Sequence, residues 1–190
     1  MKNTKRINLL GSGWLGFPLA LDLISKGFTV RGSTTSPEKI PMLKASGIDP
    51  ILVQFNQFDP APDLTALLDA DILIVSVPPG RRTAEGPDNY KRMGEILTEQ
   101  VPGSSISKLI FISSTSVYSD SNSVLTESSE ISPQTASAKV IAEIEKSLLV
   151  LPIQVIVLRL AGLFGPGRSP GRFFSGKSNI PNGFAPVNMI

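Results

Sequence analysis

The sequence predicts a doubly wound α/β fold, in which a largely parallel sheet carries helices on both faces. Short runs rich in branched apolar residues alternate with helical patterns along the 190 residues, which is typical of βαβ units around a buried parallel sheet. Apolar residues make up 41% of the chain and charged residues 18%, which suits a packed core. The chain contains no cysteine and no histidine, which excludes a disulfide framework, a zinc finger, a thiolate nucleophile and a Ser-His-Asp triad.

Six segments have the composition of strands. They are residues 7–10, 28–32, 51–54, 72–77, 109–113 and 155–160. Between the first two, Leu15, Leu19 and Leu23 recur at helical spacing and form one apolar stripe, and Gly27 is placed to end that helix. Further helices are expected over residues 36–47, 88–100 and 133–149, with an exposed polar loop over residues 119–132.

The strongest motif is Gly11-Ser12-Gly13-Trp14-Leu15-Gly16, which fits the pattern GxGxxG. It follows a predicted strand and opens an amphipathic helix, which is the context of a Rossmann dinucleotide-binding loop. Gly11 suits the tight turn, Gly13 the close approach of a pyrophosphate, and Gly16 close packing of helix on sheet. The helix N-terminus would attract the phosphates. All six residues are therefore candidate cofactor contacts; a glycine-rich turn without a ligand is the alternative.

The end of the second predicted strand bears on the choice of dinucleotide. It reads Val30-Arg31-Gly32-Ser33-Thr34-Thr35, and the first carboxylate after it is Glu38. NAD-selective proteins usually place an acid there against the ribose 2′-hydroxyl. Arg31, helped by the hydroxyls of Ser33 and Thr34, suits a 2′-phosphate. We therefore favour NADP(H), with NAD(H) as the alternative cofactor and a solvated arginine as the alternative role for Arg31.

Three further stretches, taken with the glycine loop, resemble the NAD(P)-dependent epimerase/dehydratase family of extended and atypical short-chain dehydrogenases/reductases. Residues 111–118 resemble the family's fifth strand and its hydroxyl residue, residues 133–143 the helix with the Tyr-x-x-x-Lys pair, and residues 158–167 the sixth strand and its Gly-Pro turn. The resemblance implies that Ser114 orients the substrate and that Lys139 contacts the nicotinamide ribose. It also implies cofactor contacts by Val77, Pro78 and Leu163.

The family's tyrosine is absent, because Thr135 stands four residues before Lys139. An aliphatic alcohol is a poorer general base than a phenol, whose pKa is about 10. Tyr118 fits a structural position, and Tyr90 begins a helix without a lysine four residues on. Two hypotheses follow. The chain is an atypical oxidoreductase, epimerase or dehydratase with Ser114, Lys139 and Thr135 as candidate catalytic residues, or it is a non-catalytic dinucleotide-binding sensor or scaffold.

Several of these residues also have plain structural interpretations. Ser114 can satisfy backbone groups in its turn, and Lys139 can be a solvated helix residue. Arg81 and Arg82 follow the fourth predicted strand, at the edge where open α/β sheets bind ligands. They are candidates for clamping an anionic substrate, or they only improve solubility.

The rest of the sequence bears on domains, location and partners. We expect a dinucleotide-binding domain over residues 1–165 and, in the Gly- and Pro-rich residues 166–190, the start of a truncated substrate-binding region. No run approaches the roughly 18 apolar residues of a membrane span, and the N-terminus lacks a signal-peptide pattern, so we expect a cytoplasmic protein. The net charge of +2 is scattered. We therefore expect a small or sugar-like substrate and no nucleic acid, membrane or metal, and we consider a homodimer.

Overall fold

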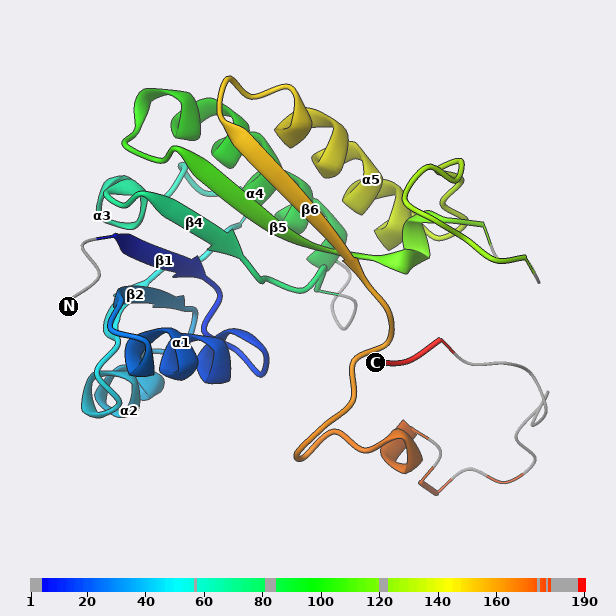
Figure 1. Cartoon of the computed structure of the whole chain (residues 1–190), viewed down its shortest axis with the longest axis horizontal. Coiled ribbons are helices and arrows are strands. Elements are labelled where there is room, and N and C mark those ends of the chain that lie inside the picture. Colours follow the sequence, from blue (N-terminus) through cyan, green and yellow to red (C-terminus); the bar gives the residue numbers. More distant parts are fainter. Residues whose placement is uncertain are drawn as a thin grey trace.

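The computed structural model describes residues 5–56, 58–80, 85–119, 123–173, 175–176, 178 and 188–190. In these parts of the chain a six-stranded sheet has the order β3-β2-β1-β4-β5-β6, and every neighbouring pair is parallel (Figure 1). Its strands are β1 (Arg6–Leu10), β2 (Thr29–Thr34), β3 (Asp49–Leu52), β4 (Ile72–Val75), β5 (Lys108–Ser114) and β6 (Gln154–Leu160). The predicted doubly wound α/β fold is confirmed.

Helices cover both faces of the sheet. They are α1 (Gly16–Ser25), α2 (Ile40–Ala45), α3 (Thr65–Leu68), α4 (Gly86–Gln100) and α5 (Ala136–Leu149), with 3-10 turns η1 (Pro37–Lys39), η2 (Val101–Gly103), η3 (Thr115–Val117) and η4 (Pro170–Phe173). Figure 1 shows α1 and α2 together near β1 and β2, and α4 and α5 together beside β4, β5 and β6.

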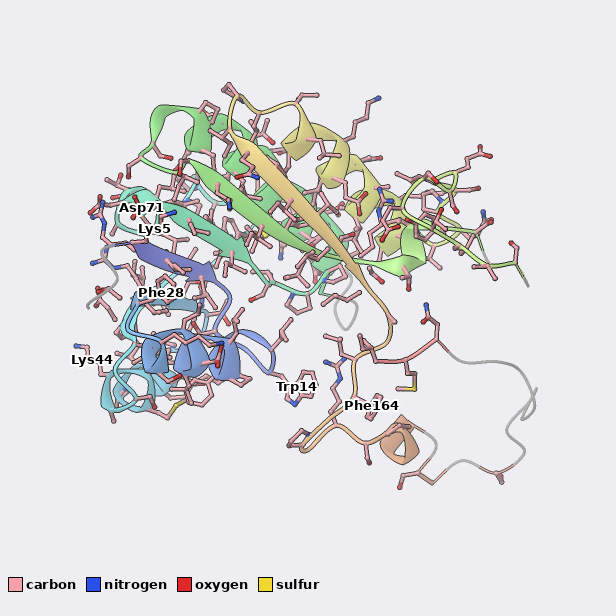
Figure 2. The ribbon with its side chains drawn as sticks, viewed as in Figure 1. Lys5, Trp14, Phe28, Lys44, Asp71 and Phe164 are labelled. Atoms are coloured by element: carbon pink, nitrogen blue, oxygen red, sulfur yellow. The ribbon has the colours of Figure 1, made fainter. Side chains whose placement is uncertain are left out.

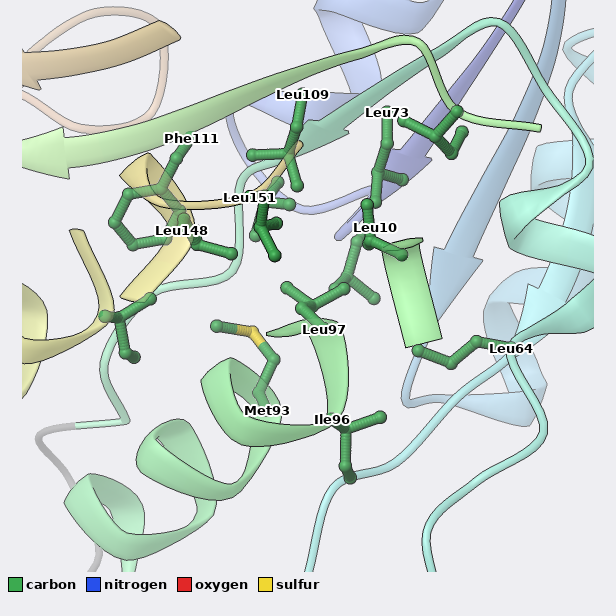
Figure 3. Packing of buried hydrophobic residues seen from close by; sticks show 14 of the residues in the cluster. Leu10, Leu64, Leu73, Met93, Ile96, Leu97, Leu109, Phe111, Leu148 and Leu151 are labelled. Carbon is green, nitrogen blue, oxygen red and sulfur yellow. The ribbon is translucent and has the colours of Figure 1, made fainter. Parts of the chain in front are cut away.

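Two apolar clusters fill the spaces between the sheet and these helices. In the larger one, Leu73, Leu109 and Phe111 of the strands face Met93 and Leu97 of α4 (Figure 3). The smaller cluster joins β1, β2 and β4 to α1 and α2; its buried members are Ile7, Leu9, Ala20, Val30, Leu43, Ile48 and Ile74. Successive side chains of a strand point to opposite faces, so the strands supply both clusters. Burying a Leu or Phe side chain contributes about 1.5–3 kcal/mol, so these clusters hold the layers together.

The element boundaries differ from the predicted ones where polar residues extend or shorten an element. β2 runs on to Thr34, because Gly32, Ser33 and Thr34 are buried and keep the strand conformation. α5 begins at Ala136, since Thr135 has an extended backbone (φ −102°, ψ 155°) and precedes the first helical residue. The short helix α3 was not predicted. None of the helices in the described parts of the chain is long and apolar enough to cross a membrane.

Candidate functional site

The strand order places the candidate site between β1 and β4. From β1 the chain proceeds to β2 and β3 on one side, whereas β4, β5 and β6 lie on the other. In open α/β sheets, ligands bind outside the carboxyl ends of the strands at this reversal of order. The glycine loop follows β1 there, and Val77 follows β4.

The three glycines of the loop differ in the space around them. Gly11 has φ +102°, and a Cβ there would lie 3.1 Å from the Ser76 carbonyl carbon. A Cβ on Gly16 would lie 2.0 Å from the Gly11 oxygen, so only glycine fits that position. At Gly13 a Cβ would meet nothing within 4 Å. The geometry agrees with the turn expected of Gly11 and the close packing expected of Gly16, and it leaves open space beside Gly13.

Two buried or half-buried serines support the loop from the neighbouring strands. The Gly11 N–H donates to the Ser33 hydroxyl oxygen at 2.8 Å, and the Ser12 N–H donates to the Ser33 carbonyl at 2.7 Å. Directly after β4, the Ser76 hydroxyl donates to the Gly11 carbonyl at 2.6 Å. Sequence reasoning missed Ser76; a small polar residue directly after the strand next to β1 was the available signal. Ser33 lies beneath the loop rather than at its surface, since the residue is only 3% exposed.

The loop presents polar groups that have no partner in the described parts of the chain. No acceptor is found there for the backbone N–H groups of Trp14, Leu15 and Gly16, and no side chain caps α1. The Ser12 hydroxyl is buried and also lacks a hydrogen-bond partner among the described residues. Free N–H groups at a helix N-terminus attract anions, and a buried polar atom calls for a partner. These groups fit the pyrophosphate and ribose of a dinucleotide.

Trp14 reaches from the loop to the chain that follows β6. Its indole Nε1 donates to the Pro166 carbonyl at 3.0 Å, and the Arg168 guanidinium carbon lies 5.0 Å from the ring centroid. Figure 2 shows Trp14 pointing toward this segment, on which Phe164 lies. The half-buried Leu163 belongs to the same segment, residues 162–164, which pairs with residues 188–190.

Arg31 makes contacts other than those expected of it. It lies in the middle of β2, in register with Asn8 of β1 and Asp49 of β3. Its Nε and Nη2 each lie 2.7 Å from Asp49 Oδ2, and Nη1 donates to the Ala66 carbonyl at 2.6 Å. The structure thus directs the guanidinium toward β3 and α3 rather than to the carboxyl edge. Thr34, the last residue of β2, does reach that edge, where its Oγ1 accepts from the Ser36 N–H at 3.2 Å.

Val77 and Pro78 lie at the carboxyl edge as expected. A methyl group of Val77 would lie 3.2 Å from a Cβ on Gly11, so this side chain borders the glycine loop. Pro78 is exposed beside it. Arg81 and Arg82, the candidate anion clamp, lie outside the described residues.

Ser114 ends β5 at the same edge of the sheet. Its hydroxyl oxygen accepts from the Ser116 N–H at 3.1 Å and thereby caps η3. This bond uses a lone pair and leaves the hydroxyl proton of Ser114 to donate elsewhere. The Ser116 hydroxyl beside it is buried without a hydrogen-bond partner among the described residues.

Thr135 and Lys139 lie at the start of α5, which packs against η3. The Thr135 hydroxyl oxygen accepts from the Ala138 N–H at 3.2 Å and so caps the helix. Lys139 is exposed on the first turn. The threonine at the family's tyrosine position therefore has a structural task, which sequence reasoning did not assign to it.

The side chains of the two tyrosines of the chain are buried. Tyr90 of α4 is 4% exposed, and burial, followed by the negative charge of Glu145, raises the pKa of its phenol well above the ordinary value. The Tyr118 hydroxyl accepts from Arg159 Nη1 at 2.7 Å. One phenol is thus enclosed in the core and the other is bound to Arg159.

A buried polar network behind Ser114 was not predicted. Glu145 of α5 is 1% exposed; its carboxylate accepts from the Ser113 hydroxyl and from Nε and Nη2 of Arg159. The bonds to Glu145 raise the pKa of the Arg159 guanidinium further. Buried charges are paired in folded proteins. The available signal was a carboxylate at helical spacing between Ile141 and Leu148, on the apolar stripe of α5.

Comparison with known proteins identifies relatives of the chain. No model of a known protein family matches it. It is 40% identical to the protein YeeZ of Escherichia coli K12 over 189 residues, which are 98% of this chain and 68% of YeeZ.

Among solved structures, MoeE5 in complex with UDP-glucose and NAD superposes with a TM-score of 0.70 and 20% identity, over 90% of this chain and 58% of that one. UDP-glucuronic acid 4-epimerase from Bacillus cereus, in complex with UDP-glucuronic acid and NAD, superposes with a TM-score of 0.69 and 19% identity. The match covers 87% of this chain and 59% of that one. A short-chain dehydrogenase/reductase superfamily protein from Agrobacterium tumefaciens with bound NAD superposes with a TM-score of 0.62 and 17% identity. The match covers 83% of this chain and 49% of that one. The chain thus spans less than two thirds of the length of each of these solved proteins. It belongs to the family of YeeZ, and its fold is that of the NAD-dependent epimerases and the short-chain dehydrogenase/reductase superfamily.

Proposed function

We propose that the chain binds a nicotinamide dinucleotide and forms the cofactor-binding part of an oxidoreductase or epimerase. The observation that carries the proposal is the glycine loop at the reversal of strand order, with open space beside Gly13 and unpartnered N–H groups on Trp14, Leu15 and Gly16. Solved proteins of the same fold were determined with NAD bound, which supports the same class of ligand here.

The chain's own residues would bind and orient the two reactants. Bound at the loop, the dinucleotide supplies hydride exchange with a carbonyl or alcohol. Ser114 would donate its hydroxyl proton to the substrate oxygen, since the bond from the Ser116 N–H occupies one lone pair and leaves the proton free. Lys139, exposed on the first turn of α5, would hold the nicotinamide ribose by its ammonium group. The substrate class is a small or sugar-like molecule.

The finer proposal is a preference for NADP(H) over NAD(H). It rests on the end of β2, where Thr34, Thr35 and Ser36 offer hydroxyl groups and the first carboxylate is that of Glu38. An acid at this position would bind the ribose 2′-hydroxyl and repel a 2′-phosphate. A Thr34→Asp variant should therefore lose more affinity for NADPH than for NADH.

A second candidate function is dinucleotide binding without turnover, as in a redox sensor or scaffold. It is favoured because each candidate proton donor has a structural role. Thr135 caps α5, Tyr90 is buried in the core and Tyr118 is bound to Arg159. The two functions are separated by assaying hydride exchange with a panel of carbonyl substrates. Sustained turnover by the wild-type protein would exclude the second function. An inert wild type, together with reductase activity gained by Thr135→Tyr, would support it.

The binding proposal is tested by fluorescence of Trp14, the single tryptophan of the chain. Binding of NADPH should quench the emission of Trp14 and increase the emission of the nicotinamide by energy transfer. The matched variants are Gly13→Ala and Gly103→Ala, because a Cβ meets nothing within 4 Å at either position. Both should fold like wild type, yet only Gly13→Ala should weaken NADPH binding, because its methyl group would stand where the pyrophosphate approaches the backbone. Equal affinities in the two variants would contradict the assignment.

A further inference from the structure

We propose that the contact between Trp14 and residues 165–168 is a strap across the dinucleotide site, which slows release of the bound cofactor. This inference rests on the proposed function. It assigns a cofactor-retaining role to Trp14 and Arg168, two side chains far apart in the sequence that meet at the carboxyl edge of the sheet.

Trp14 is held by three separate features of the turn that follows β6. The Pro166 carbonyl accepts the indole N–H at 3.0 Å. The Arg168 guanidinium lies over the ring at 5.0 Å, within the range of a cation–π interaction. A Cβ on Gly165 would lie 3.2 Å from Trp14 Cζ2, so glycine permits the close approach of the ring.

The turn itself has a fixed shape. The Arg168 N–H donates to the Gly165 carbonyl at 2.9 Å, and the Gly165 N–H donates to the Arg168 carbonyl at 3.3 Å. Gly167 has φ +70°, a backbone conformation that favours glycine. The Arg168 side chain is thereby presented to Trp14 by a hydrogen-bonded turn rather than by a free chain.

The position of the strap determines what it can do. Trp14 directly follows Gly13, where the backbone faces open space, and precedes the N-terminus of α1. The other end of the strap continues from β6, two strands beyond β4 in the sheet. A ligand seated on the glycine loop therefore lies next to a bridge from β1 to the chain after β6. The guanidinium of Arg168 also adds positive charge near the expected phosphates.

Because Trp14 remains 40% exposed, the strap is held by a few polar contacts at the surface and can open. We expect opening to precede cofactor release, as with other loops that cover a ligand. An interaction of this kind at an exposed site changes an equilibrium by about two- to fivefold.

The experiment compares Arg168→Ala with Arg168→Lys and with Arg92→Ala, an arginine of α4 whose partner is Glu95. Acrylamide quenching of Trp14 is measured without ligand, and NADPH dissociation is measured by stopped flow from the nicotinamide emission. We expect stronger quenching and about two- to fivefold faster dissociation in Arg168→Ala, with Arg92→Ala like wild type. Arg168→Lys should be intermediate, because lysine keeps the charge but not the planar group that stacks on the indole.

The other outcomes separate this inference from the function on which it rests. Unchanged quenching in Arg168→Ala, or changed quenching with unchanged dissociation, would overturn the strap and leave dinucleotide binding intact. An Arg168→Lys variant identical to wild type in both measurements would overturn it in favour of charge attraction alone. No binding of NADPH or NADH by the wild-type protein would overturn the proposed function, and the cofactor-retaining role with it.

Discussion

The Arg159 guanidinium on β6 holds the buried carboxylate of Glu145 on α5 through Nε and Nη2, at 2.9–3.2 Å. The same guanidinium donates to the Tyr118 hydroxyl, so one side chain ties β6 to α5 and to the segment after η3. Removing one partner of a buried pair leaves an uncompensated charge and costs about 3–5 kcal/mol. We expect Arg159→Met to lower the free energy of unfolding by about this amount in urea.

The control for this prediction is Arg92→Met, which breaks the exposed pair with Glu95 at 3.5 Å and should cost about 0–1 kcal/mol. A double variant, Arg159→Met with Glu145→Leu, should recover much of the loss because no charge is then left buried. Equal urea midpoints for Arg159→Met and Arg92→Met would show that the buried pair contributes no more than a surface pair.

Ser33→Ala tests the support of the glycine loop. The Ser33 hydroxyl is buried and accepts from the Gly11 N–H at 2.8 Å. Losing this bond should cost about 1–3 kcal/mol, since it leaves the N–H without its acceptor. The looser turn should also weaken NADPH binding. Ser25→Ala is the control, because that hydroxyl is exposed and donates to the Asp22 carbonyl within α1. Tight NADPH binding by a destabilised Ser33→Ala protein would show that the loop holds its shape without Ser33.

Arg31→Ala tests the contacts that the structure gives this residue. Because the guanidinium binds Asp49 and the Ala66 carbonyl, its removal should weaken the β2–β3 edge. It should leave the ratio of NADPH to NADH affinity unchanged. Titration of both cofactors against wild type and variant measures that ratio. A selective loss of NADPH affinity would instead mean that Arg31 changes its contacts to meet a 2′-phosphate.

The sheet and its loop were predictable from the sequence because they depend on local patterns. Branched apolar runs, the glycine spacing of residues 11–16 and the stripe of Leu15, Leu19 and Leu23 each indicate an element without knowledge of its neighbours. The right-handed connection of parallel strands fixes the face on which each helix packs, whereas the order β3-β2-β1-β4-β5-β6 was not predicted. The predicted strand and helix cores accordingly overlap the observed ones.

The contacts of individual side chains were not predictable, because they depend on register. Arg31 was assigned to a strand end, but β2 continues to Thr34, which places Arg31 about 10 Å from the end at about 3.3 Å per residue. Its partner Asp49 was predicted to lie before the third strand, whereas it begins β3. Thr135 was similarly placed within a predicted helix, whereas α5 begins at Ala136 and Thr135 is its N-cap. A shift of a few residues at an element's end changes which groups a side chain can reach.

Thr135 variants test whether its hydroxyl only caps α5. Replacing an N-cap threonine by alanine costs about 1 kcal/mol, whereas serine and asparagine cap as well as threonine does. We expect Thr135→Ala to unfold at a lower temperature, with Thr135→Ser and Thr135→Asn near wild type. Where turnover is found, Thr135→Asn decides the catalytic question, since it keeps the cap and removes the hydroxyl. Loss of turnover in a stable Thr135→Asn protein would assign the hydroxyl to the reaction.

The buried phenol of Tyr90 gives the protein a dependence on alkaline pH. Burial and the charge of Glu145 raise its pKa in the folded protein, whereas in the unfolded chain it is about 10. Above about pH 10 the unfolded chain releases a proton that the folded protein keeps, so the folded state binds more protons and stability falls as pH rises. Tyr90→Phe removes the phenol, and with it this dependence of stability on pH. Its free energy of unfolding, measured in urea between about pH 8 and pH 11, should therefore decline less steeply than that of wild type. Parallel curves for the two proteins would mean that Tyr90 ionises as readily in the folded protein as in the unfolded chain, and that α4 opens to water at this position.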